Sequence, residues 1–408
     1  MTVRVTIEKL GHRGDGVAKG PDGPVYVPMT LPGDVVAGEV EDGWILDAAI
    51  PEPSPHRVAP PCPRFGTCGG CALQHGSDAF VAGWKQEQVA SALASQGISA
   101  EFEAQVTSAP RSRRRATLAA RRTRKGAVVG FHGRALDAIT GIEGCVLLHP
   151  ELMAALPMLE RVTKIGASRS NEITLGVTVS ERGLDLCVAG GRGPDQAMLA
   201  QLGQFAQTHG IARLSWNGEI IVVLNEPAQS FSGLSVVPPP GAFLQATKSG
   251  EIALQDKVLN FLEGAGSVVD LFSGCGTFAL PLARRAGVLA LDGDVSLVRA
   301  LEKAVRVAQG LKPLRSETRD LFRNPLQGAE LAAFEAAVID PPRAGAREQV
   351  RALCQSEIEK IAYVSCNATT FARDARMLLD AGYTMGPVHV VDQFRWSTHV
   401  ELFAGFRR

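Results

Sequence analysis

The stretch from Ser267 to Ala279, SVVDLFSGCGTFA, decides the fold of this chain. Its first half has the pattern of a buried β-strand, and its glycines form a turn before a helical pattern. Three apolar runs, VLALD, AAVID and KIAYVS, follow with room for a helix between them, and VHVVDQF and HVELFAGF indicate a final antiparallel hairpin. This alternation predicts an α/β fold with a doubly wound parallel sheet, whose first strand-to-helix turn binds a nucleotide-like ligand.

Two parts with other patterns precede the α/β part. Residues 1–55 alternate apolar and polar positions between glycines, which predicts a small OB-type β-barrel. A proline-rich linker follows, and residues 56–240 contain many short β-type runs, so we expect a β-rich central domain. The carboxyl-terminal domain is expected to span residues 241–408.

Charge is distributed unevenly along the chain. Lys and Arg number 42, as do Asp and Glu, yet residues 1–47 hold four basic against eight acidic residues, and residues 101–150 nine against four. A hydrophobic share of 45% excludes a disordered chain. The basic residues of the central part include a run without an acid: Arg111, Arg113, Arg114, Arg115, Arg121, Arg122, Arg124 and Lys125. We expect this run to contact nucleic-acid phosphates, although a solvated basic face is the alternative.

The eight cysteines are expected to be reduced. The amino terminus has no apolar signal segment and the chain no run of 18 apolar residues, so we expect a cytosolic protein that does not enter a membrane. Thiols in that compartment are free or bind metal. Cys62-x5-Cys68-x2-Cys71 is a tight trio in a Pro/Gly loop, and Cys145 provides a fourth ligand. By itself this set favours zinc, with unliganded thiols as the alternative.

Polar residues follow the predicted strands at one edge of the sheet. Asp270 and Asp292 stand where carboxylates can bind the amine and ribose hydroxyls of S-adenosylmethionine, and DPPR at 340–343 resembles a motif of class I methyltransferases. Cys366 follows another strand at the same edge, and Glu401 interrupts the last apolar run. The glycine turn with Asp292 also fits an NAD fingerprint, but nothing in a dehydrogenase needs the proline pair.

Four segments in a fixed order make a resemblance specific: DLFSGCGTFALPLA, IDPPRAG, VSCNATTFARDA and HVELF. They resemble the RNA 5-methyluridine methyltransferase family, in its 23S rRNA type with a TRAM domain and an iron–sulfur cluster. FLQATKSGE is similar to the family's cofactor-contacting segment, and residues 7–40 are similar to a TRAM domain. The resemblance covers nearly the whole chain.

This resemblance implies a Rossmann-like, S-adenosylmethionine-dependent domain that methylates C5 of uridine in RNA. Cys366 would add to C6 of the uracil, and Glu401 would remove the C5 proton. Asp340 would contact the cofactor and orient the uracil. The implied cofactor contacts are Gln245, Phe272, Thr277, Asp292, Asp320 and Asp340, of which Thr277 and Asp320 replace an Asn found in some relatives.

The resemblance also covers the cysteines. It implies a [4Fe-4S] cluster held by Cys62, Cys68, Cys71 and Cys145, in place of zinc. Relatives with both the barrel and the cysteines act mostly on large-subunit ribosomal RNA, so 23S rRNA is the expected partner. No feature of the sequence indicates an obligate protein partner.

Alternative functions remain open at this point. A tRNA uridine-C5 methyltransferase would share the chemistry, although the tRNA enzymes of the family typically lack the barrel and the cysteines. Cytosine-C5 methyltransferases also use a thiol, but they usually carry it in a Pro-Cys pair, and the corresponding motif here is DPPR. An inactive RNA-binding protein is a further alternative, against which Cys366, Asp340 and Glu401 argue together.

Overall fold

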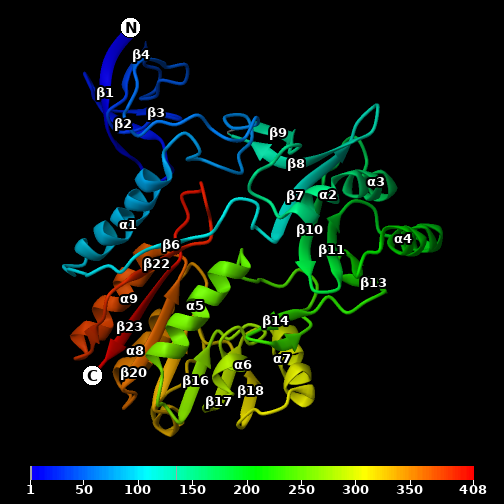
Figure 1. The fold of residues 1–408 in the computed structure, drawn as a ribbon, viewed down its shortest axis with the longest axis vertical. Coiled ribbons are helices and arrows are strands. Elements are labelled where there is room, and N and C mark those ends of the chain that lie inside the picture. Colours follow the sequence, from blue (N-terminus) through cyan, green and yellow to red (C-terminus); the bar gives the residue numbers. More distant parts are fainter. Residues whose placement is uncertain (1, 135) are drawn as a thin grey trace.

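The computed structural model describes residues 2–134 and 136–408. Figure 1 shows a small amino-terminal sheet and a central sheet side by side above a large carboxyl-terminal sheet. Within the described residues, no helix is both long and apolar enough to cross a membrane.

The amino-terminal part is a curled sheet of five antiparallel strands in the order β3-β2-β1-β4-β5. Its inward side chains form a small apolar core that includes Ile7, Val27 and Val36. A bridge between Tyr26 and Trp44 brings the chain after β4 back against β3. The strands are β1 (Thr2–Leu10), β2 (Gly16–Gly20), β3 (Gly23–Val27), β4 (Val35–Glu39) and β5 (Ala49–Glu52).

The central sheet has seven strands in the order β13-β12-β11-β10-β7-β8-β9, all antiparallel except β11 and β12. Helices α3 and α4 pack against it and against one another. Its strands are β7 (Arg115–Arg122), β8 (Ala127–Gly133), β9 (Leu136–Gly141), β10 (Ile173–Ser180), β11 (Gly183–Gly190), β12 (Arg213–Trp216) and β13 (Glu219–Val223). The helices are α2 (Pro150–Ala154), α3 (Leu156–Gly166) and α4 (Gln196–His209).

The carboxyl-terminal sheet follows the order β18-β17-β16-β19-β20-β23-β22-β6, and β21 also pairs with β23. The first five strands are parallel, whereas β23 runs antiparallel to its neighbours. The strands are β6 (Val106–Thr107), β16 (Ser267–Leu271), β17 (Gly287–Asp292), β18 (Leu314–Thr318), β19 (Ala336–Ile339), β20 (Lys360–Ser365), β21 (Thr384–Met385), β22 (His389–Asp392) and β23 (Leu402–Arg407).

Helices cover both faces of this sheet, which confirms the predicted α/β fold class. Val269 and Leu271 of β16 face one apolar core and Val268 faces the other, because successive side chains of a strand point to opposite faces. Burial on both faces explains why the strands read as continuous apolar runs. The helices are α5 (Lys248–Phe261), α6 (Ala279–Leu282), α7 (Val295–Val307), α8 (Arg347–Cys354) and α9 (Ala368–Asp380), with a 3₁₀ helix at Gly328–Ala333 and a separate hairpin of β14 (Gln229–Phe231) and β15 (Leu234–Val236).

Helix α1 (Asp78–Ala94) precedes the central sheet in the chain but packs against α9 of the carboxyl-terminal part. Its Val89 and Leu93 belong to the core on that face. Lys85 of α1 forms a fully buried ion pair with Asp392, with 2.6 Å between Nζ and Oδ1. The domain limits at residues 55 and 240 stay a prediction, and α1 and β6 lie on the carboxyl-terminal sheet although they precede residue 240.

Candidate active site

A cavity of about 640 Å³ lies at the carboxyl edge of the parallel strands. This volume is in the usual range for small-molecule sites, and the edge is where doubly wound sheets bind ligands. Both residues that the family resemblance implies as catalytic and all six that it implies as cofactor contacts line this one cavity: Gln245, Phe272, Thr277, Asp292, Asp320, Asp340, Cys366 and Glu401. The fold therefore brings together side chains that lie far apart in the sequence.

The glycine turn after β16 is built around Asp292 at the end of β17. The two carboxyl oxygens of Asp292 accept hydrogen bonds from the backbone N–H groups of Gly274, at 2.9 Å, and Asp294, at 2.8 Å. Gly276 has φ 98°, and a Cβ there would lie 2.6 Å from a methyl carbon of Leu301. Glycine is required because the turn has a left-handed backbone and packs closely on α7.

Phe272 and Asp320 form another part of the cavity wall. Phe272 has a φ of 63°, a left-handed conformation that is strained for a non-glycine residue, and its ring centroid lies 5.4 Å from that of Phe322. Asp320 accepts a hydrogen bond from the backbone N–H of Phe322 at 3.0 Å. Together with Asp292, this wall offers an aromatic surface beside two carboxylates, which suits a nucleoside bearing hydroxyl groups.

Cys366 follows β20 and precedes α9. The next residue, Asn367, donates from its amide to the carbonyl oxygen of Arg343 at 2.9 Å and accepts from the Thr369 N–H at 3.0 Å as the helix N-cap. These bonds fix the loop of Cys366 against the DPPR segment. Burial, and next the charge of Glu401, raise the pKa of the Cys366 thiol to about 11, so the free site holds it as a thiol at neutral pH.

Glu401 lies directly before β23, and because that strand is antiparallel it begins at the edge where the parallel strands end. Its carboxyl group is buried, which together with the charge of Asp340 raises its pKa well above the usual value. Gln393 donates from Nε2 to Glu401 Oε2 at 2.9 Å. Burial likewise raises the pKa of Asp340 to about 7. Two carboxyl groups with raised pKa values therefore share the cavity with a thiol.

The prediction that Asp270 contacts a ligand stays a prediction. Asp270 lies inside β16 rather than at its end, is fully buried, and does not line the cavity. Burial, and next the charge of Asp340, raise the pKa of Asp270 well above the usual value.

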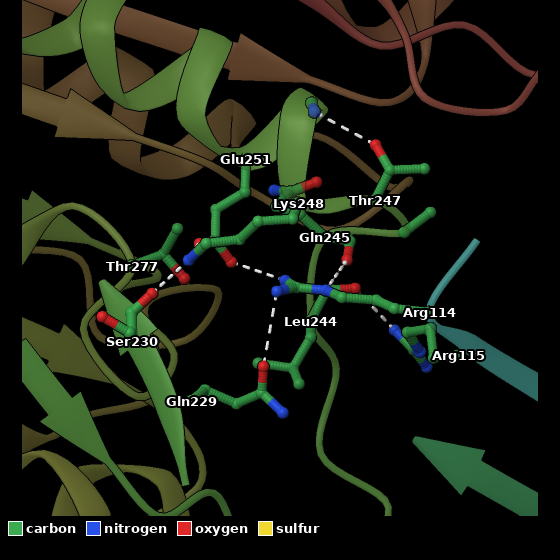
Figure 2. Close-up of polar contacts among 12 residues, drawn as sticks. Arg114, Arg115, Gln229, Ser230, Leu244, Gln245, Thr247, Lys248, Glu251 and Thr277 are labelled. Carbon is green, nitrogen blue, oxygen red and sulfur yellow. Dashed lines mark hydrogen bonds and ion pairs between the residues drawn. The ribbon is translucent and has the colours of Figure 1, made fainter. Parts of the chain in front are cut away.

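The prediction that Arg114 contacts phosphate is wrong. Its side chain is 8% exposed, and Figure 2 shows it between the Gln245 carbonyl, the Glu251 carboxylate and the Gln229 side chain. Arg114 Nε donates to the Gln245 oxygen at 3.2 Å, and Nη2 lies 2.5 Å from Glu251 Oε2. Lys248 also pairs with Glu251 at 2.5 Å. Arg114 therefore anchors the segment that carries Gln245.

Arg115 supports the same segment from the start of β7. Its Nη1 donates to the Leu244 carbonyl at 2.9 Å, as Figure 2 shows, and its guanidinium lies 4.8 Å from the centre of the Phe243 ring. Arg113, one residue before Arg114, lines the cavity itself. The exposed members of the basic run are Arg111, Arg122, Arg124 and Lys125.

The four predicted metal ligands also lie together. Cys62, Cys68, Cys71 and Cys145 line a second, mainly apolar cavity, with Phe131 beside them. The Gly70 N–H donates to Cys68 Sγ at 3.4 Å. Across the described part of the chain, however, no group of three or more His, Cys, Asp or Glu is arranged so that it could hold a metal ion.

Sequence reasoning missed His399, which lines the active-site cavity, and named Arg343 only as part of the DPPR segment. An Arg343 Nη2 lies 3.0 Å from His399 Nδ1. Gln393 does not line the cavity but holds Glu401 from behind. The signal for Gln393 was its place directly after the apolar strand that ends at Asp392, which is the position of the other site residues.

Two family models match this chain. Residues 241–405 match the model described as tRNA (Uracil-5-)-methyltransferase, and residues 1–43 match the TRAM domain. An uncharacterized RNA methyltransferase of Rhizobium meliloti is 44% identical, over 99% of both chains. The 23S rRNA (uracil(1939)-C(5))-methyltransferase RlmD of Dichelobacter nodosus is 33% identical, over 97% of this chain and 96% of its own. These matches confirm the resemblance read from the sequence motifs.

A solved structure supports the same fold. The crystal structure of Pyrococcus abyssi tRNA (uracil-54, C5)-methyltransferase in complex with S-adenosyl-L-homocysteine matches with a TM-score of 0.78. The match covers 99% of each chain at 23% sequence identity. At that identity it shows that the two chains share a fold.

Proposed function

This chain belongs to the family of S-adenosylmethionine-dependent RNA uracil-C5 methyltransferases, and on that premise we propose that it methylates a uridine in 23S rRNA through a covalent bond to Cys366. The observation that carries the proposal is the single cavity that Cys366, Glu401 and Asp340 share. A nucleophile, a base and a further carboxyl group are what methylation at an unreactive ring carbon needs.

The first step uses the thiol. C5 of uracil is a poor nucleophile, so the Cys366 thiolate adds to C6 and the electrons of the C5–C6 double bond move onto the C4 carbonyl as an enolate. The thiol must first lose its proton, because its pKa is about 11 in the free site. Asp340 and Glu401 are the carboxyl groups whose charges act on Cys366, and either can accept that proton once ionised.

S-adenosylmethionine supplies an electrophilic methyl group on a sulfonium. Attack by C5 of the enolate forms the carbon–carbon bond, and the methyl–sulfur bond breaks with its electron pair on sulfur. Glu401 then takes the C5 proton, the electrons of that C–H bond restore the double bond, and the C6–sulfur bond breaks to release the Cys366 thiolate. Burial suits Glu401 to this role, since a raised pKa makes the carboxylate a stronger base.

The cofactor is proposed to lie along the glycine turn. Asp292 and Asp320 would accept hydrogen bonds from hydroxyl or amine groups, and Phe272 would pack against the adenine. Gln245 donates from Nε2 to Asp340 Oδ2 at 3.5 Å, which supports a role for both at the border between cofactor and uracil. Thr277 completes this set, its carbonyl oxygen held by Gln255 at 2.8 Å.

The identity of the RNA rests on relatives. Similarity over almost the full length to RlmD, named for uracil 1939 of 23S rRNA, favours ribosomal RNA. A tRNA substrate is the second candidate, favoured by the family model described for tRNA and by the fold shared with the tRNA (uracil-54, C5) enzyme. Mapping 5-methyluridine in 23S rRNA and tRNA from a deletion strain separates them, because only the true substrate loses the modification.

A second cleft, of about 930 Å³, adjoins the site and is proposed to hold the RNA next to the target uridine. It shares Arg113 and His399 with the active-site cavity and reaches Trp44 of the amino-terminal part and Phe131 of the central sheet. Aromatic and cationic side chains together suit unstacked RNA. A buried uridine must leave its stack before Cys366 can reach C6, so loop RNA is the expected form.

A [4Fe-4S] cluster is proposed for the four cysteines. The donor set supports it, because four thiols line one cavity and the Gly70 N–H already donates to Cys68 Sγ. A four-iron cluster needs its cysteines further apart than a single ion does, so the lack of a tight single-ion site is compatible with it. The role of the cluster would be structural. Cys71 and Phe131 line both the cysteine cavity and the RNA cleft, so a cluster bound there would hold this part of the cleft wall in place.

The covalent step can be tested with RNA that contains 5-fluorouridine, whose C5 substituent cannot leave as a proton after methyl transfer. We expect a protein–RNA adduct that survives denaturing electrophoresis and disappears in Cys366→Ala. Glu401→Gln is expected to accumulate adduct on ordinary RNA. An adduct that persists in Cys366→Ala would remove Cys366 from the mechanism, and normal turnover by Glu401→Gln would remove Glu401.

A further inference from the structure

We propose that Gln393 is a positioning residue that fixes the Glu401 carboxyl group relative to the cofactor-contacting segment around Gln245. The proposal rests on the function proposed above for Glu401 as the base that removes the C5 proton. It assigns to Gln393 a role in that one step, after the methyl group has been transferred.

The amide of Gln393 has only one orientation that its surroundings allow. Gln393 is 1% exposed, and its Oε1 accepts from the backbone N–H of Ala246 at 2.7 Å. Because Oε1 must face that N–H, the Nε2 group points to the opposite side. There it donates to Glu401 Oε2 at 2.9 Å and to Gln245 Oε1.

These bonds connect Glu401 to the segment that Arg114 anchors. Arg114 holds the Gln245 carbonyl, and the Gln245 amide donates to Asp340. Gln393 joins this segment twice, through Ala246 and through the Gln245 side chain, and joins Glu401 once. The position of the carboxyl group is therefore set against the cofactor segment as well as by its own strand.

The hydrogen bond also has a chemical effect. Donation from Gln393 favours the ionised form of Glu401, against burial and the charge of Asp340, which favour the protonated form. Arg343 is the other group that favours ionisation, and Cys366 is the remaining titratable group in contact with this charge. Without Gln393, less Glu401 is ionised at neutral pH and proton removal from C5 slows.

The decisive variant is Gln393→Met, which has a similar volume but no donor. We expect kcat to fall about tenfold while kcat/KM for RNA stays within about twofold of wild type, because the slowed step follows methyl transfer and the accumulating adduct lowers KM together with kcat. Adduct on ordinary RNA should accumulate, and activity should recover at higher pH, where Glu401 ionises without help. The 5-fluorouridine adduct should form as in wild type.

Gln349→Met is the matched control. Gln349 is also fully buried, and its amide makes two hydrogen bonds to the backbone of Leu326, at 2.9 and 3.1 Å, away from the site. It should lose stability without adduct accumulation or a shifted pH profile. If Gln393→Met does not fold, Gln393→Glu tests the same point, because a second carboxylate beside Glu401 should shift the profile further toward high pH.

The outcomes separate this inference from the proposed function. If wild type forms no adduct with 5-fluorouridine RNA, the covalent mechanism is wrong and the role of Gln393 falls with it. If wild type forms the adduct but Gln393→Met turns over like Gln349→Met, with an unchanged pH profile, the covalent mechanism stands and the role of Gln393 is overturned.

Discussion

The Cys366 thiol and the Glu401 carboxyl group share one cavity, and burial followed by the charge of Glu401 raises the pKa of the thiol to about 11. The proposed nucleophile and the proposed base thus oppose one another's ionisation. Such a site holds Cys366 in its protonated, unreactive form while no substrate is bound. A positive charge brought close to it, such as the sulfonium of S-adenosylmethionine, would favour the thiolate.

Cys366 should become more reactive when Glu401 loses its charge. In wild type, alkylation of Cys366 should accelerate about tenfold per pH unit until the pKa near 11 is reached. Glu401→Gln removes a negative charge, so the pKa should fall and the profile should move to lower pH. Mass spectrometry of the Cys366 peptide measures the rate. Glu359→Gln, at the other end of β20, should keep the wild-type profile, and an unmoved profile in Glu401→Gln would contradict the coupling.

Lys85→Met should strongly destabilise the protein. It leaves the Asp392 carboxylate buried without a cation, for which we expect a loss of about 3–5 kcal/mol in the free energy of unfolding. Lys85 also donates to the Phe394 carbonyl at 3.0 Å, so the loop before Glu401 should loosen. Urea denaturation provides the measurement. The double variant Lys85→Met/Asp392→Leu should regain part of the loss, and equal instability of both would argue against the unpaired charge as the cause.

Two arginines of the basic run should have separable effects. Arg114→Met should weaken S-adenosylmethionine binding about tenfold, since it releases the Gln245 segment. Arg122→Gln should instead weaken RNA binding and reduce the salt dependence of binding by about one ion, as expected for an exposed phosphate contact. Calorimetry with cofactor and a filter-binding titration at several salt concentrations measure the two effects. The same loss of RNA affinity in both variants would refute this division.

Asp270→Asn should stabilise the protein increasingly as the pH rises. The pKa of Asp270 is raised in the folded state, so its favourable contribution is present at low pH and is lost as the pH rises toward the folded pKa, by about 1.4 kcal/mol per unit. Asparagine carries no such cost. Tm values measured without ligand between about pH 5 and 9 test this. Asp256→Asn, at an exposed position of α5, is the control, and a pH-independent difference for Asp270→Asn would disprove the explanation.

The cysteine cavity should hold iron. Protein purified without oxygen should be brown and carry about four iron atoms per chain, and Cys145→Ser should lose them although it lies far from the other three cysteines in the sequence. Metal analysis and the visible spectrum measure this. Colourless protein that contains zinc and no iron would overturn the cluster assignment.

Some elements could be predicted and others could not. Strands such as β16 and β20 have apolar residues on both faces, and β20 ends in Ser365 directly before Cys366, so the sequence predicts both strands and the place of Cys366. The edge strand β18, LRSET, is mostly polar, and the short β6 gains its place only by pairing with β22. Neither has a local pattern that sets it apart from a loop.

The amino-acid sequence by itself determined the α/β alternation and the glycine turn, because strand periodicity and turn chemistry are local properties, and its resemblance to a known family implied the catalytic and cofactor-contacting residues. Only the tertiary structure decided which charged side chains are exposed and which are buried in ion pairs. Arg114 lies in the same basic run as Arg122, yet one is buried against Glu251 and the other is exposed. The alignment of Glu401 with Gln393 likewise depends on Ala246, from a distant segment. Burial and hydrogen bonding set the charge state of such groups, and both arise from contacts that no local pattern contains.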